Sequence, residues 1–79
     1  MWQRIVEIVR TFTIFAMTKY SEIHRKLRRA GCYVFRNGNR HPIWKSPITG
    51  QLFETSYHEA EEAKPGTKND IEKRSGVKL

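Results

Sequence analysis

Apolar and polar residues recur with two different periods along this chain of 79 residues, and each period predicts a different kind of element. Ile23 and Leu27 repeat at the spacing of one helix face, so residues 21–30 are predicted to form an amphipathic helix. Ser21 is placed to cap its first turn, because a serine oxygen accepts a free backbone N–H there. Gly31 is predicted to end the helix, because glycine adopts left-handed backbone angles at little cost.

Three short strands are predicted after this helix. Residues 32–36 are rich in aromatic and β-branched side chains, which favour strands. The turn at 37–39 contains Asn-Gly, a strong hairpin signal, and leads into a second strand over residues 41–45. Pro42 cannot donate a ladder hydrogen bond and therefore belongs at a strand end or an edge. Residues 51–57 alternate between apolar and polar and are predicted to form the third strand.

A second helix is predicted near the end of the chain. The polar residues 58–66 form a connection, and Thr67 with Asp70 three positions later is typical of a capping box. The helix is therefore predicted to begin at Thr67 and to end at Gly76. The order helix, three strands, helix predicts an α+β fold, αβββα, in which a three-stranded antiparallel sheet carries both helices on one face.

Residues 1–16 differ from the rest of the chain. They combine a helical apolar stripe with the strand-like run TFTIF, and three charged residues interrupt them, so they do not form a transmembrane span. Two interpretations stay open: an over-extended reading frame with Met17 as the natural start, or an amphipathic element that packs on the domain or on a partner. The predicted domain is residues 17–79, and we expect a chain that begins at Met17 to fold and to stay active.

The net charge of +7 is concentrated in residues 17–45, which carry eight basic side chains and one acidic side chain. A concentrated basic surface suits a polyanion, most commonly a nucleic acid. The alternative is a basic face that is merely solvated. The candidate RNA-binding residues are Lys19, Arg25, Lys26, Arg28, Arg29, Arg36, Arg40 and Lys45.

The single cysteine, Cys32, excludes an intrachain disulfide and is predicted to be a small core residue. One cysteine and three histidines also make a structural zinc site improbable.

The three histidines are the candidates for chemistry, because imidazole exchanges protons near neutral pH. RNA carries its own nucleophile, the 2′-OH, so a histidine on a cationic surface can cleave it without a metal. His41 follows the hairpin turn, where a backbone-bonded structural histidine is the commoner case. His24 is predicted to be solvated on the basic helix, and His58 to close a turn. The glutamates that follow His58 are predicted to be a solvated connection.

Residues 17–79 resemble the HicA (YcfA-like) family of small toxins from bacterial toxin–antitoxin pairs. The matching pieces, in order, are KYSEIHRKLRRAGCYVFR, NGNRH, YH at the predicted end of strand three, PGT, and a helix that closes with SGV. The resemblance implies a fold similar to double-stranded-RNA-binding domains. It also implies a cytoplasmic endoribonuclease that cleaves mRNA without a metal cofactor and is neutralised by a HicB-type antitoxin protein. It implies that His41 is the catalytic residue and that His58 is secondary.

Two further readings come from different functional classes. One is a non-catalytic RNA-binding module, or an inactive toxin-like domain, that uses the basic helix for phosphate recognition. The other is an interaction protein that assembles through residues 1–16. If the chain is an enzyme, the meander places the start of strand two and the end of strand three at the same edge of the sheet. His41 and His58 are then predicted to approach one phosphate from two sides.

Overall fold

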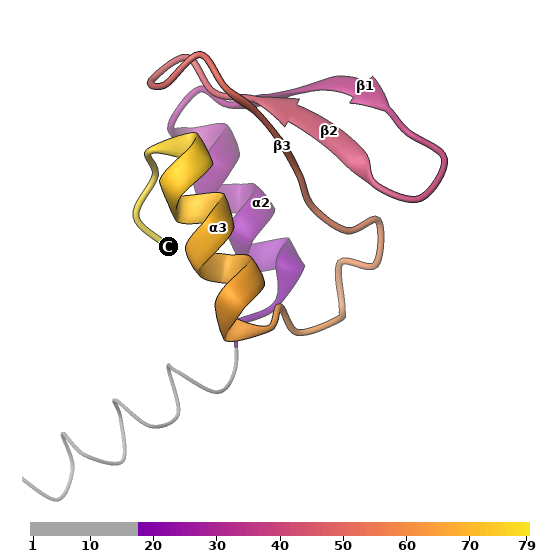
Figure 1. Ribbon diagram of the computed structural model, residues 1–79. Helices are drawn as coiled ribbons and strands as arrows, with labels where there is room; N and C mark the ends of the chain where they lie inside the picture. Colours follow the sequence, from indigo (N-terminus) through magenta and orange to yellow (C-terminus); the bar gives the residue numbers. More distant parts are fainter. Residues whose placement is uncertain (1–17) are drawn as a thin grey trace, which may run out of the picture.

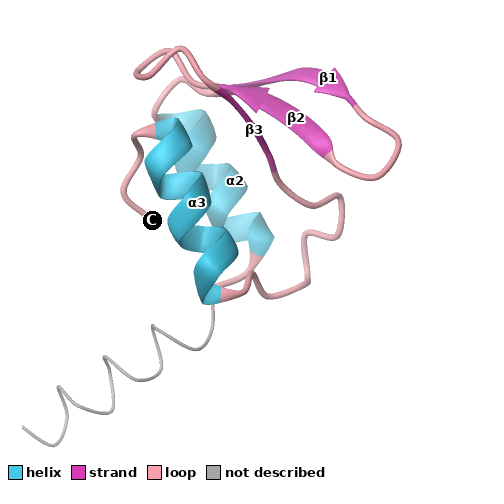
Figure 2. Ribbon diagram, in the orientation of Figure 1, coloured by secondary structure: helices cyan, strands magenta, loops and turns pink. Residues whose placement is uncertain are grey.

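The computed structural model describes residues 18–79, so the predictions about residues 1–16 and about a start at Met17 lie outside the described part. Residues 18–79 form two helices and three strands, whose arrangement is drawn in Figure 1 and Figure 2. In chain order the elements are α2 (Tyr20–Arg29), β1 (Tyr33–Asn37), β2 (Pro42–Lys45), β3 (Leu52–Glu54) and α3 (Pro65–Ser75). The predicted α+β order, αβββα, is confirmed.

The sheet is an antiparallel meander in the order β1-β2-β3, so β2 is central and β3 is an edge strand. Both helices lie on one face of it, as predicted (Figure 1). Pro42 is the first residue of β2, a position at which the missing N–H does not interrupt the ladder. The other face of the sheet, called the outer face below, is covered by neither α2 nor α3.

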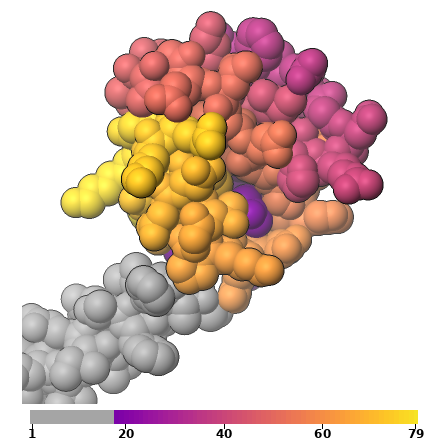
Figure 3. All heavy atoms as spheres, viewed as in Figure 1, coloured from indigo at the N-terminus to yellow at the C-terminus, as the bar shows by residue number. Residues whose placement is uncertain are grey.

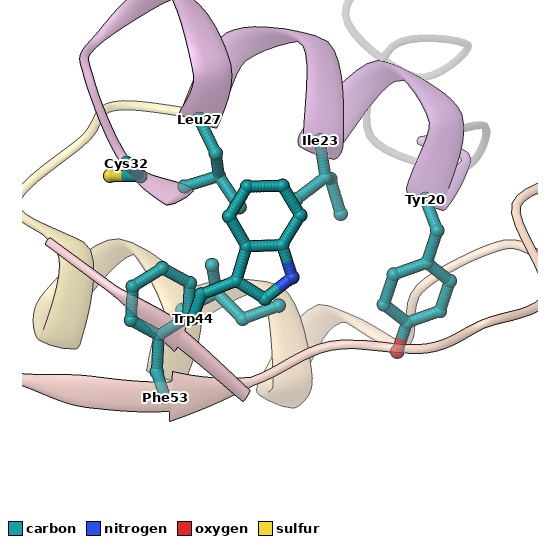
Figure 4. Packing of buried hydrophobic residues seen from close by; sticks show 7 residues of the cluster. Tyr20, Ile23, Leu27, Cys32, Trp44 and Phe53 are labelled. Atoms are coloured by element: carbon teal, nitrogen blue, oxygen red, sulfur yellow. The ribbon is translucent and has the colours of Figure 1, made fainter. Parts of the chain in front are cut away.

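The core is built around Trp44 at the centre of β2. Its partners in the ladder are Val34 on β1 and Phe53 on β3, and successive side chains of a strand point to opposite faces. Figure 4 shows the indole between Phe53 and the apolar side chains of α2. The buried apolar residues are Tyr20, Ile23, Leu27, Cys32, Trp44, Phe53 and Ile71. Cys32 is thus a core residue, as predicted.

The first turn of α2 is capped differently from the prediction. The helix begins at Tyr20, and no side chain caps it. The N–H of Tyr20 donates to the carbonyl of Glu61 at 3.0 Å, and the N–H of Ser21 donates to the carbonyl of Glu59 at 2.9 Å. The predicted Ser21 cap is therefore wrong, because the connection after β3 folds back and supplies backbone acceptors to these free donors.

The start of α3 is also earlier than predicted. It begins at Pro65 rather than at Thr67, with Lys64 as its N-cap and no side-chain capping bond. Proline suits a first helical position, because its fixed φ is already helical and the N–H that it lacks has no partner there. The capping box was therefore the wrong signal. Gly76 ends the helix as predicted, with φ of +72°.

The third strand is much shorter than the predicted 51–57. It ends at Glu54, and the side chains of Thr55 and Ser56 are both buried. The hydroxyl of Ser56 accepts the N–H of His58 at 3.0 Å, which turns the chain away from the sheet. His58 therefore lies in the connection beyond the strand and does not end it.

Candidate active site

The hairpin between β1 and β2 presents His41. The N–H of Gly38 donates to the carbonyl of His41 at 3.1 Å, so Asn39 and Arg40 form the tip. The prediction of a turn at 37–39 was one residue too early. Glycine is required at 38, because a Cβ there would lie 2.6 Å from the carbonyl oxygen of His41. The phenol of Tyr57 donates to the carbonyl of Gly38 at 2.7 Å and ties the hairpin to the connection after β3.

The imidazole of His41 is accessible and loosely paired. Its side chain is 51 % exposed, and its Nδ1 lies 3.7 Å from Oε2 of Glu54 on β3. That distance is too long for a hydrogen bond, but it suits an ion pair when the imidazole is protonated. His41 is therefore open to a substrate and has a carboxylate beside it.

A groove of about 610 Å³ extends from the hairpin across β3 to α3. Its charged lining residues are Arg36, His41, Glu54, Asp70 and Arg74. Figure 3 shows the hollow between α3, in orange and yellow, and the strands, with the indigo start of α2 at its floor. Arg74 already pairs with Asp70 at 3.0 Å, whereas Arg36 has no ion-pair partner within residues 18–79. Arg36 is thus the cation of this groove that is available to an anionic ligand.

Tyr20 also lines the groove, at the start of α2. Burial raises the pKa of its phenol above the usual value of 10.0, and the negative charge of Glu61 raises it further. The phenol therefore stays neutral throughout the physiological range and is not a base of this groove.

The structure brings the start of β2 and the end of β3 together, as the meander predicted. The N–H of Thr55 donates to the carbonyl of Pro42 at 3.2 Å. His58 is exposed but lies three residues further along, after a turn. Among the contacts of residues 18–79, no hydrogen bond or ion pair joins the rings of His41 and His58. A division of acid and base roles between them stays a prediction.

His24 is not the solvated residue that the basic helix suggested. It is 3 % exposed and belongs to a buried hydrogen-bond chain. Its Nε2 lies 2.8 Å from Oγ1 of Thr55, and its Nδ1 lies 3.1 Å from Oε1 of Glu59. Nε1 of Trp44 donates to the same Thr55 oxygen at 2.9 Å. Glu59, predicted to be part of a solvated connection, is therefore a partner of this buried histidine.

The donors and acceptors in the hydrogen-bond chain of Trp44, Thr55, His24 and Glu59 can be assigned from their chemistry. Because the Glu59 carboxylate can only accept, Nδ1 of His24 carries a proton. In the neutral tautomer with its proton on Nδ1, the Thr55 hydroxyl accepts the indole N–H and donates its own proton to Nε2 of His24. The order Thr–His–Glu resembles a hydrolase triad, but the Thr55 hydroxyl is buried and already holds two partners. The arrangement is thus structural.

One sequence signal could have placed His24 correctly. Counted along the helix, His24 follows Tyr20 by four residues and Ile23 by one, so it borders the apolar stripe. The surrounding cations suggested a polar face, but position along the helix decides which face a residue occupies.

The eight predicted RNA-binding residues do not form one surface. Arg36 lines the groove, Arg40 is at the hairpin tip and Lys45 lies on the outer face of the sheet. The others lie on or beside α2, and three of these have partners within the chain. Arg25 pairs with Glu22 at 2.7 Å, the ammonium of Lys26 donates to the carbonyl of Leu79 at 3.1 Å, and Arg28 lies 5.4 Å from the centre of the Trp44 ring.

Comparison with protein-family models, with curated proteins and with solved structures gives no match to this chain. Residues 18–79 contain no helix that is long and apolar enough to cross a membrane. The same part of the chain holds no cluster of three or more His, Cys, Asp or Glu side chains that suits a metal ion. A functional assignment therefore rests on the geometry of the site and on the resemblance described above.

Proposed function

We propose that this chain is an endoribonuclease that cleaves mRNA by histidine acid–base catalysis, in the manner of a HicA-like toxin. The observation that carries the proposal is the position of His41. The imidazole is half-exposed at a groove and has no hydrogen bond within residues 18–79, and the guanidinium of Arg36, which has no ion-pair partner in the same range, lines this groove too. This combination supplies a proton acceptor and a phosphate ligand in one groove.

The reaction needs a base, a phosphate ligand and an acid, for which the candidates are His41, Arg36, and His58 or water. His41 takes the proton of a 2′-OH, whose oxygen then attacks the adjacent phosphorus. Arg36 binds the phosphate and stabilises the charge that develops on it. The bond from phosphorus to the 5′-oxygen breaks, and that oxygen takes a proton from His58 or from water. The products are a 2′,3′-cyclic phosphate and a 5′-hydroxyl.

Glu54 has a supporting role in this scheme. Its carboxylate lies 3.7 Å from Nδ1 of His41, so it stabilises the imidazolium that forms when the 2′-OH is deprotonated. Both side chains are more than half exposed, and solvent therefore weakens this attraction. Glu54 is accordingly a modest contributor, and His41 carries the reaction.

The experiment that tests this function compares His41→Ala with His58→Ala, two substitutions at exposed histidines. Cleavage of one long RNA is followed over time, and the ends of the products are identified. We expect His41→Ala to lower the cleavage rate by about 10²–10⁴-fold, the range for loss of a general base. We expect His58→Ala to have a smaller effect. Circular dichroism should show that both variants are folded.

Two outcomes would redirect the assignment. Full activity of His41→Ala would remove this residue from the mechanism. RNA binding by the unsubstituted chain without any cleavage would support the non-catalytic RNA-binding module instead. The resemblance also implies a HicB-type antitoxin as the neutralising partner in the cytoplasm, and such a protein should suppress the cleavage measured here.

A further inference from the structure

The outer face of the sheet exposes aromatic rings. Every residue of β1 is exposed, although the strand is part of the sheet. Tyr33 is 50 % exposed and Phe35 is 54 % exposed. A solvent-facing strand more often carries polar residues, and contiguous exposed apolar surface commonly marks a binding site.

A β-bulge in β1 determines which side chains share this face. Val34 pairs with Trp44 and Arg36 pairs with Ile43, so Phe35 is an extra residue between them. Trp44 points into the core, and its neighbours Ile43 and Lys45 therefore point outward. The ammonium of Lys45 lies 5.8 Å from the centre of the Phe35 ring, which places that ring on the outer face as well. Bulges commonly redirect a side chain in this way.

The outer face thus carries two rings among cations. Tyr33 pairs with Lys45 across the ladder, and Arg36 follows Phe35 directly. Arg36 also lines the groove that holds His41, so the outer face with its aromatic rings is continuous with the candidate catalytic residue. Glu54 is the only carboxylate that the three strands contribute to this face. The positive charge of the outer face complements a polyanion, and the two rings on that face suit flat apolar ligands.

We infer that the outer face binds single-stranded RNA, with unpaired bases stacked on Tyr33 and Phe35 and phosphates held by Arg36 and Lys45. Bases stack on exposed aromatic rings when they are free of a duplex, and such stacking tolerates any base. The bound RNA strand then passes His41 and presents a phosphate group to it. This inference names the substrate class of the proposed ribonuclease and rests on that function only for cleavage, not for binding.

The test measures binding separately from cleavage. A chain carrying His41→Ala is titrated with a fluorescent 12-nucleotide RNA, once single-stranded and once annealed to its complement. We expect the single strand to bind at least tenfold more tightly. In the same background, Phe35→Ala and Tyr33→Ala should each weaken single-strand binding by about 5- to 150-fold, the range for loss of one base–ring stack.

Two control variants separate stacking from general apolar contact and from fold. Phe35→Trp retains a ring and should retain most of the affinity. Leu52→Ala removes an exposed apolar side chain that lines the groove but carries no ring, and it should weaken binding much less than Phe35→Ala. The salt dependence adds a third check. Removal of a ring should leave the slope of log affinity against log salt unchanged, whereas Arg36→Ala should reduce it by roughly one.

Equal binding of duplex and single strand would overturn the inference. A loss with Leu52→Ala as large as that with Phe35→Ala would do so too, because it would show that apolar contact rather than ring stacking carries the binding. If the rings govern binding but the unsubstituted chain cleaves no RNA, the single-strand surface stands and the proposed ribonuclease fails. If cleavage depends on His41 while the ring variants bind normally, the proposed ribonuclease stands and the single-strand surface fails.

Discussion

His24 and His41 are the same residue type in two contrasting environments. His24 is buried, stacks on Trp44 and uses both ring nitrogens in hydrogen bonds. His41 is half-exposed, and a Glu54 carboxylate oxygen lies 3.7 Å from its Nδ1. Each has a glutamate partner, but only His41 lies where a ligand can reach it. The comparison teaches that a histidine is available for chemistry when the fold leaves its ring nitrogens accessible and without hydrogen bonds to other residues.

The physical reason lies in the cost of a buried polar group. An imidazole in the core must satisfy both nitrogens, because a buried donor or acceptor without a partner costs about 1–3 kcal/mol. Thr55 and Glu59 meet this requirement for His24. Water meets it for His41, and water is easily displaced by a substrate. The structure thus assigns a stabilising role to one histidine and leaves the other free.

The largest effect on stability should come from breaking the buried network at its centre. Thr55→Val keeps the volume of the side chain but leaves Nε1 of Trp44 and Nε2 of His24 without partners. We expect the free energy of unfolding to fall by roughly 2–4 kcal/mol, measured by urea denaturation. Thr67→Val, at an exposed threonine of α3, is the control and should change stability little. An unchanged stability of Thr55→Val would mean that His24 is not held as the contacts indicate.

A smaller effect should follow from loosening the hairpin that carries His41. Tyr57→Phe removes the 2.7 Å hydrogen bond to the carbonyl of Gly38. We expect a loss of about 0.5–1.5 kcal/mol in stability and a lower kcat for RNA cleavage with KM nearly unchanged. Tyr33→Phe also removes one hydroxyl, but that hydroxyl has no hydrogen bond among the described residues, so it is the matched control. Equal kcat values for the two variants would show that the hairpin holds its position without Tyr57.

The smallest effects should come from the two glutamate partners. Substitution of one should change stability, and substitution of the other should change the cleavage rate. Glu59→Gln weakens the bond to His24, so we expect a stability loss of less than about 1 kcal/mol and normal cleavage. Glu54→Gln removes the charge beside His41, so we expect normal stability and a change of a few-fold in cleavage rate. Urea denaturation and RNA cleavage on both variants would show this crossing pattern. The comparison would fail if both substitutions changed the same quantity.

Much of the fold was predictable because its signals are local. The helical spacing of Ile23 and Leu27 and the Asn-Gly turn between two apolar runs require only neighbouring residues. The order αβββα and the placement of both helices on one face followed from these signals and from short connections. Position 41 was also identified as a candidate site, but local sequence alone favoured a structural histidine there, and the family resemblance made it the catalytic candidate. The exposure of its ring was not visible in sequence.

The features that only the tertiary structure decided all depend on residues far apart in the chain. The free N–H groups at the start of α2 are met by carbonyls of Glu59 and Glu61, so no capping side chain was needed. His24 is buried because Thr55, 31 residues later, faces it from the segment after β3. The bulge at Phe35 exists only in register with β2. Local sequence fixes which elements form, because their bonds are local, while packing decides which polar groups are satisfied and which stay open to a ligand.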